Sequence, residues 1–316
     1  MPSRVVVVND FAHVQGGAAR VAIDTAIGLA SRIREVVFLA GCGPADSRMA
    51  EAGVQVEVLD LVPANRDPSK LRGLRRGLWD RSVARAVEAL LPDPANSLVH
   101  FHTFTDCLTA SAPWAAERSG AAVLYTLHDY NFGCPYGGFY NYTLHRPCGR
   151  VGLSMRCLGT NCNRGQLANR LWRLGRLQTQ RLRGVPSPTS GFVFISSFQR
   201  RRLEPYLPPE SPRFELSNPV SIERSDPSDP GATDIFTFVG RLTPEKGPVD
   251  FANAAREARV RARFVGDGPL AEHVREASPE GEMAGWQHED EVQRLMRASR
   301  AIVMPSRWFE GQPLVA

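Results

Sequence analysis

Short apolar runs alternate with amphipathic stretches along most of the chain. Glu35-Val-Val-Phe-Leu-Ala40 and Ile235-Phe-Thr-Phe-Val239 are mainly apolar and rich in β-branched and aromatic residues, which is typical of buried parallel strands. Between such runs, apolar residues recur at helical spacing, and the alternation predicts an α/β fold with parallel sheets. We expect strands at about residues 4–10, 35–40, 54–59, 97–103, 121–129, 191–197, 214–220, 235–239, 262–266, near 283 and at 301–304. We expect helices at about 17–30, 70–91, 166–183, from 199 onward, and at 247–259, 269–277 and 289–299.

The length and the spacing of these elements predict two domains. A chain of 316 residues can bury two cores of ordinary size. Residues 221–233 are rich in Pro, Ser and Asp, which indicates a hinge. We therefore expect one Rossmann-like domain over 1–220 and a second over 234–316, with a loop-rich insert at about 130–165 that interrupts the first.

Charge is distributed unevenly along the chain. The formal net charge is +5, and the segment from Tyr130 to Arg202 holds twelve arginines with no Asp, Glu or Lys. Such a block indicates an anionic partner, for which we expect a membrane surface, a lipid-linked phosphate or a charged glycan. A solvated arginine face is the alternative. No nucleic-acid motif accompanies the charge, so we expect no nucleic-acid partner.

Targeting signals and membrane spans are not predicted. No apolar run approaches the ~20 residues that cross a bilayer. The first residues run directly into a strand pattern and lack a secretory apolar region. We expect a cytoplasmic protein that associates peripherally with the inner face of the cell membrane through its arginines.

The loop after the strand at 235–239 has the composition of an anion site. Gly240-Arg-Leu-Thr-Pro-Glu-Lys-Gly247 joins that strand to a helix, and Arg241 and Lys246 add two cations to the helix N-terminus. A diphosphate is the ligand that this arrangement favours. Two surface cations beside an ordinary strand–helix turn are the alternative.

A second glycine loop follows the first strand. Gly16 and Gly17 open the helix at 17–30, where backbone N–H groups favour an anion. The segment does not contain the GxGxxG fingerprint, so we do not expect NAD. A plain strand–helix turn is again the alternative.

Histidines end two of the expected strands. His128 and Asp129 follow the apolar run 121–127, where the carboxyl end of a parallel strand points into the ligand crevice of an α/β fold. His128 is the main catalytic candidate on that side, with a structural histidine as the alternative. His100 and His102 share one face of another strand, and a metal pair, a structural role and a substrate-facing role all remain open.

The insert at 130–165 contains four of the six cysteines, Cys134, Cys148, Cys157 and Cys162. Four thiolates in a loop-rich segment suggest a tetrahedral zinc site, since zinc can replace a missing core. The spacing lacks a CxxC pair, and two disulfides or free thiols remain as alternatives. The position beside His128 suggests that the insert shapes or covers an acceptor pocket.

Three segments together resemble a known family. They are Gly240-Arg-Leu-Thr-Pro-Glu-Lys-Gly247, Val265-Gly-Asp-Gly-Pro-Leu270 and Met304-Pro-Ser-Arg-Trp-Phe-Glu-Gly-Gln-Pro-Leu314. In this order, each after an apolar strand, they are similar to landmarks of the family 4 retaining glycosyltransferases. The resemblance implies the GT-B fold, with two Rossmann-like domains, and transfer of a sugar from a nucleotide-diphosphate donor to a glycan or lipid-linked acceptor. Polysaccharide or glycoconjugate biosynthesis is the implied process.

The resemblance also assigns roles. It implies that Arg241 and Lys246 bind the donor diphosphate, that Gly16 and Gly17 face it from the other domain, and that His128 lies at the transfer site. Glu310 and Gly311 would hold the donor sugar. No Asp-x-Asp accompanies the donor loop, so we expect no catalytic metal or other cofactor, apart from a structural zinc.

One departure from the family pattern concerns the end of the sequence. The family has a ribose-binding glutamate eight residues after the first, and that position falls just beyond Ala316. We therefore expect a C-terminally truncated chain whose second domain is incomplete. Alternative functions are a non-catalytic nucleotide- or glycan-binding fragment, or a sugar-nucleotide epimerase or phosphorylase of similar fold.

Overall fold

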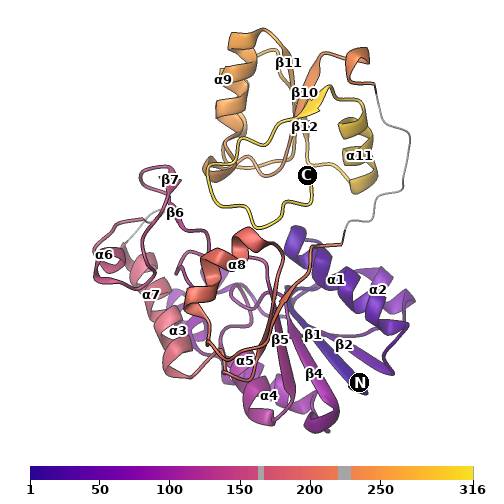
Figure 1. Cartoon of the computed structure of the whole chain (residues 1–316), viewed down its shortest axis with the longest axis vertical. Helices are drawn as coiled ribbons and strands as arrows, with labels where there is room; N and C mark the ends of the chain where they lie inside the picture. The colour runs from indigo at the N-terminus through magenta and orange to yellow at the C-terminus, as the bar shows by residue number, and fades with distance from the viewer. Residues whose placement is uncertain (163–166, 220–228, 316) are drawn as a thin grey trace.

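The computed structural model describes residues 1–162, 167–219 and 229–315, which form two lobes, each around a parallel sheet (Figure 1). The larger sheet has the strand order β3-β2-β1-β4-β5-β8-β9, and the smaller has the order β12-β11-β10-β13. Neighbouring strands are parallel in both. These are two Rossmann-like α/β units, as the sequence predicts.

The larger sheet comprises β1 (Arg4–Phe11), β2 (Glu35–Cys42), β3 (Gln55–Val58), β4 (Ser97–Phe101), β5 (Ala122–Leu127), β8 (Gly191–Phe194) and β9 (Arg213–Glu215). The smaller comprises β10 (Ile235–Val239), β11 (Arg261–Val265), β12 (Glu282–Gly285) and β13 (Ala301–Ile302).

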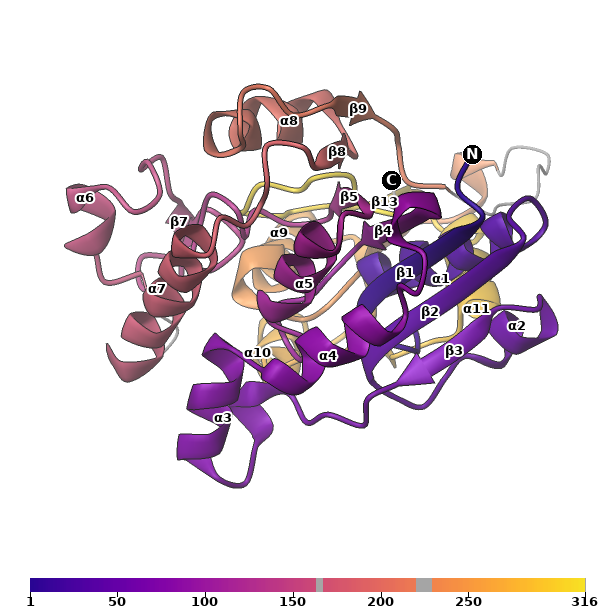
Figure 2. The same cartoon turned by 90° about the horizontal axis from the view of Figure 1, so that it is seen from below.

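Helices cover both faces of the larger sheet (Figure 2). The α-helices of the first lobe are α1 (Gly17–Ala30), α2 (Ser47–Glu51), α3 (Lys70–Leu78), α4 (Arg81–Ala89), α5 (Ser111–Ser119), α6 (Met155–Leu158), α7 (Leu167–Leu182) and α8 (Ser197–Leu203). Those of the second lobe are α9 (Pro248–Ala258), α10 (Ala271–Ala277) and α11 (Glu289–Arg297). A small antiparallel hairpin, β6 (Tyr140–Asn141) with β7 (Arg146–Pro147), lies in the cysteine-bearing insert.

The apolar run of β1 supplies both cores of the first lobe. Val6 and Val8 pack with α4 and α5 on one face, whereas Val5 and Val7 pack with α1 and α2 on the other. All four are buried, and burial of each valine stabilises the fold by about 1.5–3 kcal/mol. A central strand buried on both faces explains why this segment is continuously apolar rather than alternating.

The segment predicted as one helix over 70–91 is two helices. Trp79 has an extended backbone, which ends α3, and Asp80 starts α4 by accepting the N–H of Ser82 at 2.9 Å. Asp80 also accepts a bond from Arg76 at 3.0 Å. The helical spacing of apolar residues continues through this break because both helices pack on the same lobe. The spacing therefore did not reveal the N-cap at Asp80.

The predicted hinge at 221–233 lies largely outside the described residues, since 220–228 are not among them. In the described part of the chain, no helix is long and apolar enough to cross a bilayer.

Candidate functional site

The three glycosyltransferase-like segments come together in the second lobe. β10 ends at Val239, and in the loop that follows Leu242 N donates to Asp267 O of the second segment at 2.9 Å. The third segment joins through Arg307 N to Glu245 O at 2.8 Å. The three segments, which are separate in the sequence, therefore form one cluster of loops around the start of α9.

Gly247 explains why this loop is tight. Its φ is +68°, a left-handed conformation that favours glycine, and a Cβ there would lie 2.3 Å from the carbonyl oxygen of Pro305. The absence of a side chain at Gly247 therefore lets the loop before α9 lie directly against the loop after β13.

Lys246 and Glu310 form an ion pair within this cluster. Lys246 Nζ donates to Glu310 Oε1 at 2.7 Å, and Ser306 Oγ donates to the same oxygen at 2.7 Å. Burial raises the pKa of Glu310, but the charge and hydrogen bond of Lys246 outweigh it and the net pKa is lowered. Arg241 is exposed on the same loop. The structure therefore brings Lys246 and Glu310 together and leaves Arg241 on the surface of the same loop.

The loop that carries Glu310 also contacts the first lobe. Ser196 Oγ donates to Gly311 O at 2.6 Å, and a Cβ at Gly311 would lie 2.9 Å from Ile195 Cδ1. The Arg202 guanidinium lies 4.0 Å from the centre of the Phe309 ring. Gly311 is therefore positioned at a close contact between the lobes, next to the predicted donor residues.

Gly16 and Gly17 lie at the N-terminus of α1, as predicted. Both are exposed, and the helix begins at Gly17 without a side-chain cap. A Cβ at Gly17 would lie 3.1 Å from Leu314 Cδ1, while one at Gly16 would meet nothing within 4 Å. The uncapped N–H groups of the first turn therefore face the segment that follows Glu310.

His128 belongs to a row of three histidines at the ends of β4 and β5. His102 Nδ1 lies 2.9 Å from His128 Nε2, and the rings of His100 and His102 lie 4.4 Å apart. Burial lowers the pKa of His100 to about 4. Burial, followed by the charges of neighbouring histidines, lowers the pKa of His102 and lowers that of His128 to about 3. All three rings are therefore neutral near neutral pH.

A small cavity of about 20 Å³ adjoins these histidines. His102, His128 and Asp129 line it together with residues of the following loop. Burial raises the pKa of Asp129 to about 6, although Asn131 donates to its carboxylate through N at 2.8 Å. The predicted candidates His128 and Asp129 thus meet at one pocket at the carboxyl end of the sheet.

Three functional candidates were missed from the sequence. Asp10 accepts four backbone N–H bonds from residues 105–108, at 2.8 to 3.0 Å, and so shapes the loop after β4. Arg176 is buried, donates to Thr105 O at 2.6 Å and faces Asp129 electrostatically. Tyr130 is buried and interacts electrostatically with Arg202 and Glu310. The available signal was the position of Asp10 at the carboxyl end of β1 and of Tyr130 after β5. Arg176 could not be distinguished from the other arginines of α7.

The four insert cysteines, Cys134, Cys148, Cys157 and Cys162, line a second cavity on the same side of the first lobe. Within the described residues, no group of three or more His, Cys, Asp or Glu side chains is already arranged as a metal site.

Two family descriptions match the chain. Residues 16–156 match the "Glycosyl transferase 4-like domain", and residues 233–316 match "Glycosyl transferases group 1". No curated protein matches the chain significantly. With the two Rossmann-like sheets, these matches make the chain a glycosyltransferase of the GT-B fold.

Several solved structures are similar to this chain. WaaG, a glycosyltransferase involved in lipopolysaccharide biosynthesis, is similar with a TM-score of 0.55 and 14% identity over 96% of this chain and 75% of WaaG. AviGT4, involved in avilamycin A biosynthesis, has a TM-score of 0.49 and 16% identity over 99% of this chain and 74% of AviGT4. TarM of S. aureus, solved with fondaparinux, alpha-GlcNAc-glycerol and UDP, has a TM-score of 0.43 and 13% identity over 73% of this chain, which spans 41% of TarM.

Proposed function

We propose that this chain transfers a sugar, with retention of anomeric configuration, from a nucleoside diphosphate to a glycan or lipid-linked acceptor. The observation that supports the proposal is the Lys246–Glu310 ion pair. Its two atoms lie 2.7 Å apart where the loop 240–247 meets the segment 304–314. A paired cation and carboxylate can exchange partners for a phosphate and a sugar hydroxyl when a donor binds.

The chemistry of transfer assigns a role to each side chain. The acceptor hydroxyl forms a bond to the anomeric carbon as the bond to the diphosphate breaks, so negative charge grows on the leaving phosphate. Arg241 and Lys246 would stabilise that charge, which accelerates the reaction because the charge is greatest in the transition state. The uncapped α1 N-terminus at Gly16 and Gly17 would contribute backbone N–H groups from the other lobe.

The acceptor would enter on the histidine side. His128 is neutral near neutral pH, so it would bind a sugar hydroxyl by hydrogen bonding rather than by charge. Gly311 would keep Glu310 close to the first lobe, where Tyr130 faces it. Donor and acceptor would then meet between the lobes.

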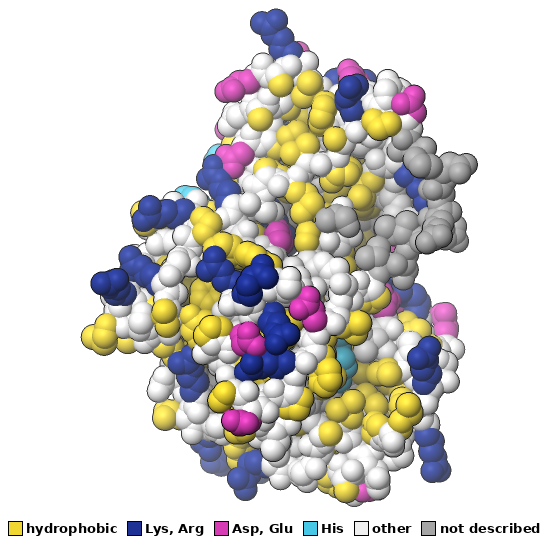
Figure 3. Space-filling view, viewed as in Figure 1, with side chains coloured by type: hydrophobic (Ala, Val, Ile, Leu, Met, Phe, Trp, Pro, Cys, Tyr) yellow, Lys and Arg dark blue, Asp and Glu magenta, His cyan; other side chains and the backbone are white. Residues whose placement is uncertain are grey.

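We also propose that the acceptor side lies on an anionic membrane surface in glycoconjugate synthesis. Large apolar side chains are exposed on α3 and α7, at 77% for Leu71, 68% for Leu171 and 78% for Leu182. Lys and Arg side chains surround this side of the first lobe (Figure 3). Exposed leucines among arginines are the composition of an interfacial surface.

Calorimetric binding of UDP, GDP and ADP tests the donor site directly. We expect one nucleotide to bind, and Lys246→Ala to weaken it at least tenfold. The chain has only one other lysine, so Lys70→Ala, at the exposed start of α3, is the matched control. A folded chain that binds none of the three nucleotides would overturn the proposal for this chain.

A further inference from the structure

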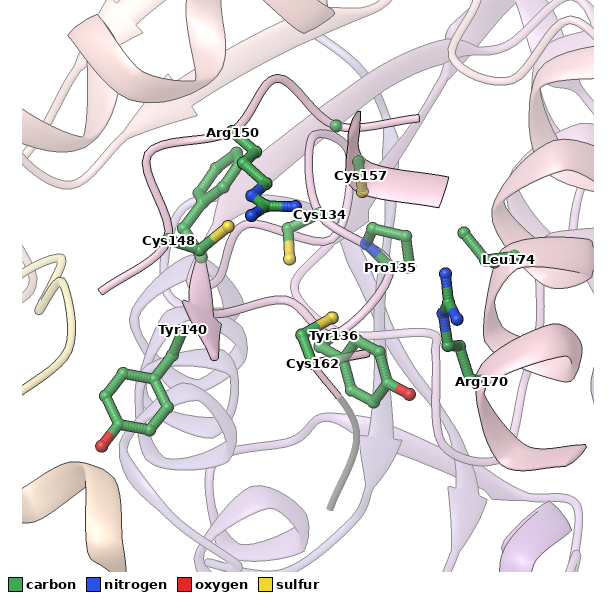
Figure 4. A pocket seen from close by; sticks show the side chains of 12 residues that line it. Cys134, Pro135, Tyr136, Tyr140, Cys148, Arg150, Cys157, Cys162, Arg170 and Leu174 are labelled. Carbon is green, nitrogen blue, oxygen red and sulfur yellow. The ribbon is translucent and has the colours of Figure 1, made fainter. Parts of the chain in front are cut away.

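We propose that the insert binds one zinc ion through the thiolates of Cys134, Cys148, Cys157 and Cys162. The four side chains come from separate parts of the insert and line one cavity (Figure 4). The cavity volume of about 20 Å³ is sufficient for one particle the size of a water molecule, which suits a single ion.

Local structure brings each cysteine to the cavity. Cys134 lies in a turn in which Gly137 N donates to its carbonyl at 2.8 Å. The β6–β7 hairpin then folds back, so that Cys148 N donates to Phe139 O at 2.6 Å. Ser154 caps α6 by accepting the N–H of Cys157 at 3.2 Å. Backbone geometry, rather than close sequence spacing, therefore gathers the sulfurs.

Backbone N–H groups surround the sulfur of Cys134. The N–H groups of Tyr136, Phe139 and Gly138 all donate to it. Several N–H donors converging on one sulfur stabilise the charged ligand that a metal requires. A neutral core thiol has no need of such donors.

Zinc binding would displace the protons of the four thiols, so that each sulfur binds the ion as a thiolate.

The lining also balances the charge of the complex. Zinc with four thiolates has a net charge of about −2, and Arg150 and Arg170 line the same cavity. Arg150 is fixed by a bond from its guanidinium to Arg156 O at 2.8 Å. The insert contains no Asp or Glu between Tyr130 and Gly165 that would compete for these arginines.

The proposed ion would hold the insert against both lobes. Gly152 N donates to the Tyr206 hydroxyl at 3.1 Å in the first lobe. A Cβ at Gly138 would lie 3.1 Å from the Trp308 ring of the second lobe. The ion would cross-link the separate parts of the insert that contribute the four cysteines.

Metal analysis of the full chain, purified without chelators or immobilised metal, tests the proposal. We expect one zinc per chain, and after exchange to cobalt the intense absorption of a tetrahedral tetrathiolate complex. Cys134→Ser and Cys157→Ser should lose the metal, whereas Cys157→His, which keeps a ligand, should retain it. Cys42→Ser is the matched control, because Cys42 is buried beside Cys107 and away from the insert.

Outcomes on the wild-type chain decide the question even if a serine variant misfolds. Folded, zinc-free protein whose insert thiols all react with a thiol reagent would overturn the proposal. Disulfides within the insert by mass spectrometry, or bound iron with acid-labile sulfide, would also overturn it. Hydrogen exchange should slow over the insert when zinc is added back to chelated protein, a result that needs no transferase activity.

Discussion

Lys246 and Glu310 are 64 residues apart in sequence, yet their side chains form a hydrogen-bonded ion pair at 2.7 Å. Both side chains are 20% exposed, so the pair is accessible to a ligand rather than sealed in a core. The Trp308 ring lies 5.1 Å from Lys246 Nζ and limits where the ammonium can move. The two residues thus hold each other in position in the absence of a donor.

Removal of the Lys246 charge should impair the chemical step. Lys246→Met keeps much of the side-chain length and removes the cation, and we expect kcat to fall roughly 100- to 1,000-fold. Steady-state kinetics with a donor that binds would measure the effect. Lys70→Met should leave kcat unchanged, and an equal loss in both variants would contradict a role at the leaving group.

Glu310 should make folding stability depend on pH in a defined direction. Its pKa is lowered in the folded state, so the stabilisation is present above the unfolded value of about 4.3 and is lost as pH falls through the folded pKa. Glu310→Gln should cost about 1 kcal/mol near neutral pH, and the difference from wild type should shrink below about pH 4. Urea unfolding of both proteins across this range is the measurement, and a difference that persists unchanged at acid pH would argue against the pair.

The three-histidine row should resist protonation. With folded pKa values near 4 and 3, His100 and His128 stay neutral while unfolded histidines titrate at about 6.5. Stability should therefore fall as pH drops from about 6.5 toward the folded values, because the unfolded chain binds protons first. NMR of the imidazole C–H signals should show no titration of His128 between about pH 5 and 8.

Alanine substitutions at two glycines can distinguish the cost of backbone strain from the cost of a steric clash. Gly247 and Gly285 both have φ of +68°, but only Gly247 has a neighbour, Pro305 O, within reach of an added Cβ. Gly285→Ala should lower the free energy of unfolding by about 1 kcal/mol through strain, and Gly247→Ala by about 3 kcal/mol or more. Equal losses in thermal or urea unfolding would mean that the contact with Pro305 does not constrain the loop.

The proposed membrane face can be tested with vesicles. We expect the chain to sediment with vesicles that contain anionic phosphatidylglycerol, and much less with neutral phosphatidylcholine. Leu171→Ser combined with Leu182→Ser should weaken binding. Trp286→Ser removes an exposed aromatic residue of the second lobe and should have no effect. Binding that ignores both lipid charge and the leucines would contradict the proposal.

Prediction from the sequence succeeded where local pattern determines structure. The strand at Ile235–Val239 has the predicted bounds, because an apolar run ended by a glycine is a local signal. It failed at Trp79 and Asp80, where a helix cap interrupts a periodicity that tertiary packing continues.

Contacts between distant residues could not be predicted in the same way. Asp10 was overlooked because its partners lie in the loop after β4, and Tyr130 was overlooked because Glu310 lies in the other lobe. The convergence of the four cysteines depends on the path of a hairpin and a short helix, and irregular spacing conceals such a path. The donor loop was recognised because its residues are contiguous, whereas its pairing with Glu310 emerged only in the fold.

The contact between Gly138 and Trp308 links the proposed acceptor specificity to the proposed donor specificity. Gly138 belongs to the insert beside the proposed acceptor pocket, and Trp308 belongs to the loop that carries Glu310, so one side must fit the other to within a methyl group. If the insert were exchanged for that of a related enzyme, a side chain at the position of Gly138 would clash with Trp308. The 304–314 loop would therefore have to be exchanged with the insert. In protein engineering, the insert and the 304–314 loop should therefore be treated as one unit. A change of acceptor preference made through the insert would require a matching change in the 304–314 loop.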